Sequence, residues 1–310
     1  MDPTCEEIFE EYYHKCLKLC RQELSEAARA GNDEPLYYIG FALSATSVIP
    51  LATHLDSCWL THAQLQRLLP WTSHLNVMMA NLKSQGELDY IDPQDECFLE
   101  LLHALGTTEL PTHILNRKTQ HHHFWYQYCR GGIGIEEGCG LPCSLLDLLS
   151  QLGNPSMTDA LLSWQAPEGD LAQIYSWDAT RFAAIIRAFE DSKPTQDLDV
   201  AAWLMYRGIS LQDLVDSVLA CIRQCLPSVP PELGHFKQTL LFPLVMAASQ
   251  RTLLSVEAKD FIYQTLQHEA SERNYFHYQG VVRIIQAHWN NDADTIEETA
   301  RRMDVELCLW

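Results

Sequence analysis

The sequence predicts an all-α protein, a single irregular array of roughly ten to thirteen helices. Apolar residues recur at steps of three and four along nearly the whole chain, which is the spacing of an amphipathic helix. The sequence has no sustained alternation of apolar and polar residues, and no Asn-Gly or Asp-Gly pair indicates a β-hairpin. This pattern favours helices packed against helices.

The expected helices follow one another from the N-terminus, separated by capping and turn-forming residues. Thr4 and Glu7 have the spacing of a capping box ahead of the first helix. Asn32 or Asp33 is placed to begin the second, and Pro70 is expected to kink or break the third. The expected helical ranges are 8–20, 36–43, 61–82, 93–105, 143–152, 159–164, 171–189, 200–222, 233–249, 257–269, 275–289 and 292–303.

The connections between these helices predict one domain over residues 1–310. The expected linkers are 105–115, 130–142, 194–198 and 226–233, and none is long or polar enough to mark a flexible boundary. An alternative division has two halves, 1–195 and 196–310. No repeat of fixed period is present in the sequence.

The charge of the chain argues against a polyanionic partner. Its 310 residues include 21 Lys and Arg against 41 Asp and Glu, a formal net charge of −20. Affinity for nucleic acid depends mainly on Lys and Arg that neutralise phosphates, so we expect no direct nucleic-acid binding and no membrane binding. The hydrophobic share of 47% is that of an ordinary folded protein rather than a disordered one.

The termini and the cysteines predict a protein of the nucleus or cytoplasm that is not secreted. The first fifteen residues are acidic and lack the cationic start of a signal peptide. The longest apolar run, 240–248, contains Pro243 and is too short to span a bilayer. The 11 cysteines are an odd number, which fits reduced thiols in such a compartment.

The segment around residues 120–129 is the most unusual local composition. His121, His122 and His123 are candidate acid–base groups together with Tyr126, because histidine titrates near neutral pH. Trp125 and Tyr128 are candidates to line a ligand pocket. The alternative is a half-exposed helix with aromatic anchors in the core, since consecutive histidines on a helix point about 100° apart.

The remaining motifs predict packing rather than a metal or a cofactor. The cysteine pairs are spaced i, i+4, on one helix face, without the C-x2-C knuckle typical of zinc sites: Cys16/Cys20, Cys139/Cys143 and Cys221/Cys225. Residues 130–140 hold five of the 14 glycines but satisfy no phosphate-loop motif, so an interhelical turn is expected. The adjacent acids Glu136/Glu137 and Glu297/Glu298 are expected to be solvated. No cofactor and no metal is predicted.

Three stretches carry a family resemblance through their order and spacing. Residues 35–45 follow a helix with Tyr12-Tyr13, residues 138–150 form a turn-Pro-Leu-Leu pattern, and the Pro-containing 240–248 is followed by 281–289, which ends in Trp. Together they resemble the fungal-specific transcription factor domain, the helical regulatory region of zinc-cluster proteins. The six-cysteine cluster and basic residues of that family's DNA-binding module are absent from this sequence.

The resemblance implies a regulatory or small-molecule-sensing protein in transcription regulation, tied to secondary metabolism and without its own DNA contacts. Its expected partner is a hydrophobic small molecule or another protein. The alternative is a cofactor-free and metal-free enzyme of cyclase, pericyclase or isomerase type, which positions a hydrophobic fungal natural-product intermediate in an aromatic-lined pocket. A third hypothesis, a pure scaffold, predicts an exposed apolar groove.

Overall fold

The computed structural model describes residues 103, 106–107, 109–117, 123–136, 139–154, 156–192, 204–229, 239–273, 276–291, 295–305 and 307–309. Contacts between residues divide the chain into two compact units, Met1–Leu105 and Gly106–Trp310. Apart from His103, the described residues belong to the second unit. The helices expected before residue 105, the pair Cys16/Cys20, and His121 with His122 lie outside the described residues. The single-domain organisation stays a prediction.

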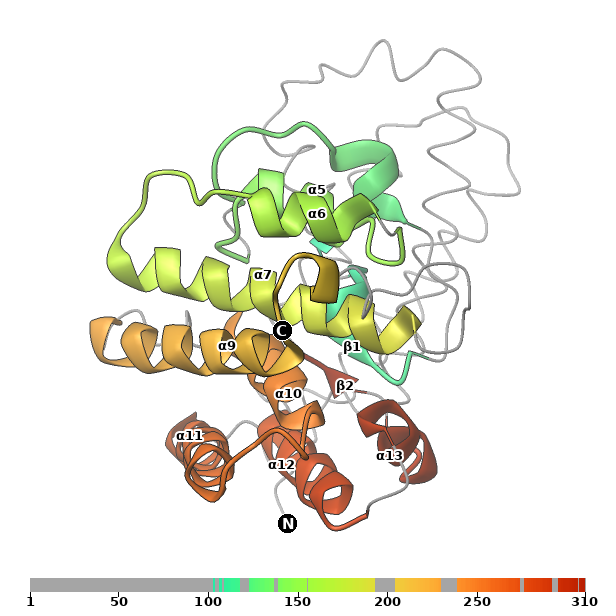
Figure 1. Ribbon diagram of the computed structural model, residues 1–310, viewed down its shortest axis with the longest axis vertical. Helices are drawn as coiled ribbons and strands as arrows, with labels where there is room; N and C mark the ends of the chain where they lie inside the picture. Colours follow the sequence, from blue (N-terminus) through green and yellow to red (C-terminus); the bar gives the residue numbers. More distant parts are fainter. Residues whose placement is uncertain are drawn as a thin grey trace, which may run out of the picture. The chain divides into compact units, whose positions relative to one another are not determined.

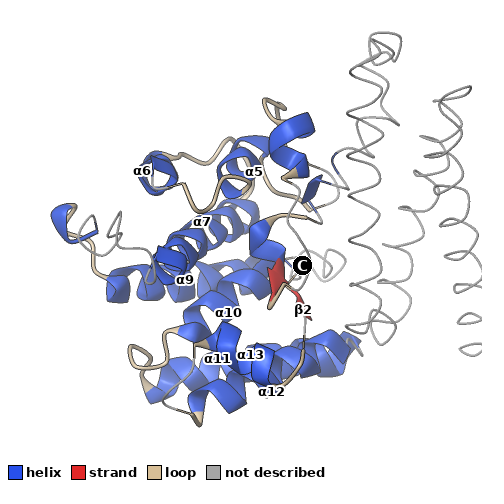
Figure 2. Cartoon of the chain, turned by 90° about the vertical axis from the view of Figure 1, so that its right-hand side faces the viewer, coloured by secondary structure: helices blue, strands red, loops and turns tan. Residues whose placement is uncertain are grey.

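The second unit is helical, which confirms the all-α class (Figures 1 and 2). Its described residues contain α5 (Cys143–Leu149), α6 (Ser156–Ser163), α7 (Leu171–Ser192), α9 (Leu211–Cys225), α10 (Leu241–Ser249), α11 (Val256–Arg273), α12 (Phe276–Trp289) and α13 (Ile296–Arg302). The short elements are η2 (Pro111–His113), the π-helix η3 (Trp125–Cys129), η4 (Leu226–Ser228), β1 (Ile114–Leu115) and β2 (Leu307–Cys308). Within the described residues, no helix is both long and apolar enough to cross a membrane.

The core of the unit is built on α7, which lies beside α9 (Figure 1). The buried face of α7 includes Trp177, Ala179, Ala183 and Ile186, and its alanines let the backbones approach closely. On α9 the buried apolar residues fall at steps of three and four, the amphipathic pattern expected from the sequence: Leu214, Val215, Val218, Leu219 and Ile222. Burial of these facing surfaces stabilises the pair.

Helix α10 lies between the α7–α9 pair and the C-terminal helices (Figure 2). All of its residues are buried, as expected for a helix that is apolar on every side. The C-terminal end of α12 is fixed to it, because Trp289 Nε1 donates to the Ala248 carbonyl at 3.0 Å. His288 Nε2 lies 3.0 Å from the Ser249 carbonyl oxygen.

A two-stranded pairing, which the sequence did not predict, joins β1 to β2. The strands are antiparallel, with Ile114 opposite Cys308 and Leu115 opposite Leu307. The Leu309 N–H extends the ladder by donating to the His113 carbonyl at 2.7 Å. Two residues are too few to show an alternating pattern in a sequence, so periodicity could not reveal this pair.

The helix expected over residues 200–222 is broken, and the expectation of one continuous helix was wrong. Residues 204–206 are helical, a turn follows at Arg207 and Gly208, and α9 begins after Ser210. Gly208 has φ +69°, a conformation that side chains disfavour. Ser210 and Asp213 then form a reciprocal capping box, which satisfies two backbone N–H groups at the start of α9.

Candidate functional site

Within the aromatic segment, Trp125–Cys129 form a π-helix, which is wider than the expected α-helix. Trp125 is buried in the core, whereas Tyr126 and His123 are exposed. Tyr128 is half-buried, its ring centroid lies 4.8 Å from that of Phe124, and burial raises the pKa of its phenol. The described residues therefore have the arrangement of a half-exposed segment with aromatic anchors in the core, and a catalytic role for His123 and Tyr126 stays a prediction.

Asp147 on α5 holds the π-helix and the following glycine-rich segment together. Its Oδ1 accepts from Trp125 Nε1 at 2.8 Å, and its Oδ2 accepts from the Gly131 N–H at 3.0 Å. One carboxylate thus fixes both the buried indole and the first turn of the loop. Hydrogen bonds to a carboxylate are stronger than those between neutral groups, so these contacts hold the start of the loop against α5.

The segment 130–142 lies between η3 and α5, and its described residues, 130–136 and 139–142, form an interhelical turn as predicted. The Cys143 N–H donates to the Gly134 carbonyl at 2.9 Å, and Ile135 forms an isolated antiparallel bridge with Pro142. Glu136 is buried rather than solvated, because its Oε2 accepts from the Cys139 N–H at 2.6 Å. Trp177 Nε1 donates to the Gly140 carbonyl at 2.8 Å and ties the loop to α7.

The described cysteines have the properties of packing residues. Cys139 lies in the turn before α5 and Cys143 begins that helix, so the prediction that this pair shares one helix face was wrong. Cys221 and Cys225 both lie on α9, as expected. Burial raises the pKa of Cys129, Cys139 and Cys143, and it raises that of Cys221 to about 11.

A protonated thiol is a poor nucleophile and a poor metal ligand. Consistent with this, the described residues contain no group of three or more His, Cys, Asp and Glu side chains that is placed to hold a metal ion. Burial therefore favours the neutral form of the described thiols, which pack beneath the turn.

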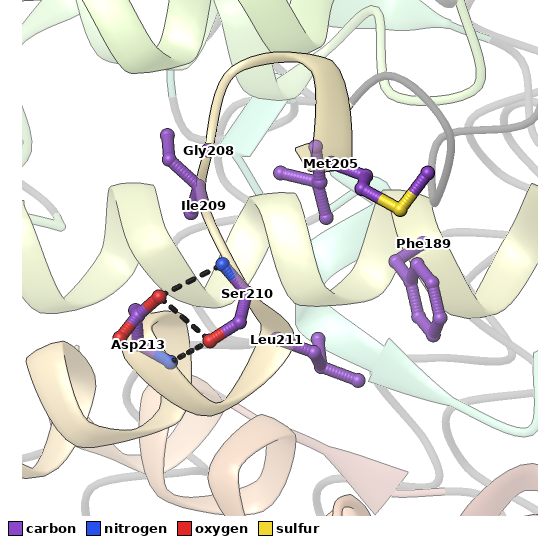
Figure 3. A pocket seen from close by; sticks show the side chains of 8 residues that line it. Phe189, Met205, Gly208, Ile209, Ser210, Leu211 and Asp213 are labelled. Atoms are coloured by element: carbon purple, nitrogen blue, oxygen red, sulfur yellow. Dashed lines mark hydrogen bonds between the residues drawn. The ribbon is translucent and has the colours of Figure 1, made fainter.

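A surface pocket of about 340 Å³ lies between the end of α7 and the start of α9 (Figure 3). Its lining residues come from α7, from the turn before α9 and from the first turn of α9: Phe189, Leu204, Met205, Gly208, Ile209, Ser210, Leu211 and Asp213. Most of these side chains are apolar. The pocket thus offers an apolar group a place to leave water.

The polar groups of the pocket are used by the capping box of α9 (Figure 3). Asp213 Oδ2 accepts from the Ser210 N–H at 2.8 Å and from Ser210 Oγ at 2.6 Å, while Ser210 Oγ accepts from the Asp213 N–H at 3.1 Å. The hydrogen bonds from Ser210 lower the pKa of Asp213 below its ordinary value of 3.8. A carboxylate whose pKa is lowered is charged near neutral pH and is a weaker base than an ordinary one.

The surroundings of the pocket combine exposed apolar side chains with acidic ones. Met205 and Tyr206 are 79% and 87% exposed. Arg207 pairs with Asp159 of α6. The sequence analysis missed these residues because it placed them within one helix; Gly208 followed by the spacing of Ser210 and Asp213 is the signal that would have revealed the break.

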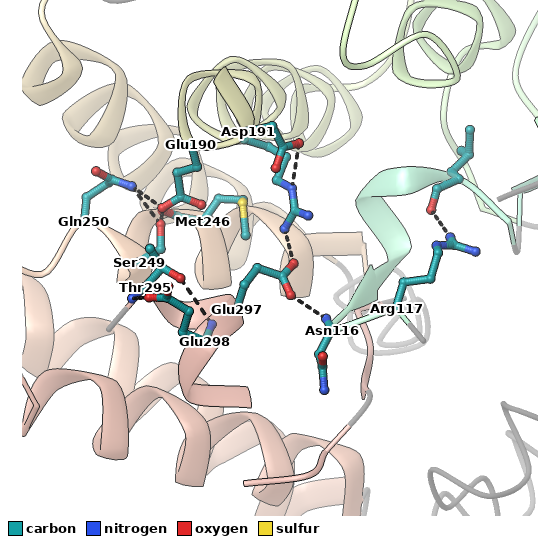
Figure 4. Close-up of polar contacts among 12 residues, drawn as sticks. Asn116, Arg117, Glu190, Asp191, Met246, Ser249, Gln250, Thr295, Glu297 and Glu298 are labelled. Carbon is teal, nitrogen blue, oxygen red and sulfur yellow. Dashed lines mark hydrogen bonds and ion pairs between the residues drawn. The ribbon is translucent and has the colours of Figure 1, made fainter. Parts of the chain in front are cut away.

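A second polar cluster joins α7, α13 and the turn after β1 (Figure 4). Glu297 accepts from Arg187 Nη1 at 2.5 Å and from the Asn116 N–H at 2.7 Å, so it is not the solvated acid that the sequence predicted. Neighbouring carboxylates, first among them Glu297, raise the pKa of Arg187 despite its burial. Asn116 Nδ2 also donates to the Val305 carbonyl at 2.8 Å.

The same region includes a contact between α7 and the end of α10. Gln250 Nε2 donates to Glu190 Oε1 at 2.6 Å and to Ser249 Oγ at 2.9 Å. The bond between Gln250 and Glu190 links side chains 60 positions apart in the sequence, and the Gln250 amide also donates to the neighbouring Ser249. These bonds indicate a structural cross-link rather than a reacting centre.

Comparison with known proteins yields no relative. No family model matches the chain, and neither a curated protein nor a solved structure does. The fold and the pocket define a class only: a helical protein whose described unit carries a small apolar surface pocket. Its function therefore has to be argued from its own residues.

Proposed function

We propose that this chain is a regulatory, small-molecule-sensing protein tied to secondary metabolism, in keeping with the resemblance of its sequence motifs to the fungal-specific transcription factor domain. Its ligand is a hydrophobic small molecule that occupies the pocket between α7 and α9. The observation that carries the proposal is the composition of this pocket, which is apolar except for a hydroxyl and a carboxylate already bound to each other.

The size and lining of the pocket suit binding. A volume of about 340 Å³ is at the lower end of ligand sites, enough for a compact molecule or one end of a larger one. Affinity would come mainly from burial of apolar surface against Phe189, Leu204 and Leu211. Because Ser210 and Asp213 bond each other in the capping box, the pocket offers a ligand mainly apolar contacts, and this favours sensing over catalysis.

The position of the pocket gives binding a structural consequence. Its walls come from α7 and from the turn that precedes α9, so a bound ligand bridges the two. A ligand that binds only the folded state stabilises it, by about 2.7 kcal/mol at a hundredfold excess over Kd. We expect the ligand to fix residues 204–210 against α7. This would change the surface that these residues present to a partner protein.

The test is thermal unfolding of the full chain with a panel of neutral apolar polyketides and terpenoids, each incubation also analysed by mass spectrometry. We expect at least one compound to raise Tm by about 5 °C at saturation without being converted. Met205→Asp places a charge at the pocket without touching the core, and it should remove the shift. Val256→Asp alters an equally exposed aliphatic residue on α11 and should retain it.

An enzyme remains the second candidate, and one observation favours it. The π-helix η3 carries the exposed Tyr126, and the Arg130 guanidinium carbon lies 4.6 Å from the centre of its ring. Single π-helical turns occur frequently at functional sites. Conversion of a compound in the same panel, lost in Tyr126→Phe and retained in Met205→Asp, would replace the sensing proposal with this one.

A further inference from the structure

The glycine-rich loop presents an isoleucine to solvent on a rigid support. Ile133 is 98% exposed, and Ile135, two residues further on, is partly exposed. The loop is fixed on both sides of Ile133, by Gly131 N–H bonded to Asp147 and by Cys143 N–H bonded to Gly134. A side chain presented on a preorganised backbone loses little conformational entropy when it binds.

The same unit contains a pocket that fits such a side chain. A branched four-carbon group is small enough for a volume of about 340 Å³ and chemically matches a lining of Phe189, Leu204 and Ile209. Within one copy the isoleucine cannot be the occupant, because it is exposed to solvent. A second copy of the chain can supply it.

The charges around the two surfaces are complementary. Arg130 is the exposed charged residue among the described loop residues 130–136, since Glu136 is buried. At the pocket, Asp213 is exposed and Asp216 follows it one turn later on α9, also exposed. The nearby cation Arg207 is paired with Asp159, so the start of α9 keeps a negative surface.

We propose that Ile133 of one copy inserts into the pocket of a second copy, with Arg130 facing Asp213 and Asp216, and that ligand and loop compete for the pocket. The competition rests on the proposed function, whereas the association between copies does not. Two copies can exchange loop and pocket reciprocally about a two-fold axis, or the contact can continue head to tail into a ring or an open filament. Binding of the ligand would then release single chains, which makes oligomeric state the output of the sensor.

The contact is small, one aliphatic side chain with an exposed ion pair, and is well below the size of a stable interface. We therefore expect weak and reversible association. It should be measured by sedimentation velocity of the full chain at physiological salt, up to protein concentrations on the order of 0.1–1 mM. The sedimentation coefficient of the wild-type chain should rise with concentration.

Three variants identify the contact. Ile133→Asp should abolish the rise, whereas Val256→Asp, which alters an exposed aliphatic residue elsewhere, should keep it. Arg130→Asp and Asp216→Arg should each weaken association by about threefold, the effect of one exposed ion pair. An equimolar mixture of these two variants should associate better than either alone, because the altered loop of one then meets the altered pocket of the other.

A wild-type chain that stays monomeric, or an Ile133→Asp chain that associates as the wild type does, would overturn the proposal. A separate experiment tests the proposed function. Nile red, a neutral apolar dye, is titrated into the monomeric Ile133→Asp chain, and its binding is measured. If the dye binds the Ile133→Asp chain but not the double variant Ile133→Asp/Met205→Asp, the pocket is supported as a ligand site even if association fails. Association without any dye binding would retain the contact between copies and remove the ligand.

Discussion

At the scale of single residues, Asp147 shows how one side chain determines local structure. Its two oxygens accept from an indole of the π-helix and from a glycine N–H of the loop. Sequence periodicity placed Asp147 on a helix but gave no sign of either partner, since both depend on how the chain folds back. An acid with two donors of this kind is expected to contribute more to stability than a surface acid.

We predict that Asp147→Ala lowers the free energy of unfolding by about 2–3 kcal/mol, because two donors lose a charged acceptor. Asp147→Asn should cost about half as much, since the amide oxygen still accepts one bond. Urea unfolding followed by tryptophan fluorescence measures both. Asp260→Ala, an exposed position on α11, is the control and should stay within about 0.5 kcal/mol of the wild type. Equal effects of Asp147→Ala and Asp260→Ala on the free energy of unfolding would contradict a stabilising role for the two hydrogen bonds to Asp147.

At the scale of elements, the capping box explains why α9 begins where it does. The hydrogen bonds from Ser210 hold the pKa of Asp213 below its ordinary 3.8. Folding therefore favours the ionised form, and the resulting stability is present above pH 3.8 and is lost as the pH falls through the lower, folded-state value. The capping box of α13 follows the same rule, because the Thr295 N–H and hydroxyl lower the pKa of Glu298.

We predict that Asp213→Asn lowers Tm at pH 6 and that its difference from the wild type shrinks as the pH is lowered toward 3. Differential scanning calorimetry across this range provides the measurement. Asp260→Asn should show no such convergence, because Asp260 lies in the interior of α11 and takes no part in a helix cap. A difference for Asp213→Asn that stays constant with pH would show that the carboxylate charge plays no part in the cap.

At the scale of the whole described unit, the Arg187–Glu297 pair joins residues 110 positions apart in the chain. We predict that Arg187→Met destabilises the unit by about 2–3 kcal/mol, below the range for fully buried pairs because both side chains are partly exposed. Adding Glu297→Gln should recover about 1 kcal/mol, since the amide still accepts from Asn116 and the Glu297 charge is removed. The recovery is partial because Asp191, the second partner of Arg187, keeps its charge. A double variant less stable than Arg187→Met, in the same chemical unfolding assay, would contradict this account.

The described unit also shows what a sequence can and cannot predict. Long amphipathic stretches identified α7, α11 and α12 to within a few residues, because each buries one continuous face. The pairing of Ile114 with Cys308 depends on chain closure and has no local signature. The pocket depends on Phe189 lying next to the turn at Gly208. It could not be predicted because the sequence analysis placed residues 200–222 in one continuous helix.

Hydrogen exchange measured by mass spectrometry, with and without the stabilising compound, tests the sensing proposal most directly. At a protein concentration at which the chain is monomeric, we predict slower exchange in peptides that cover residues 185–192 and 204–213, which carry the pocket, and no change in peptides that cover 123–136. Protection confined to 123–136, with the pocket peptides unaffected, would contradict the account and transfer the site to the aromatic segment.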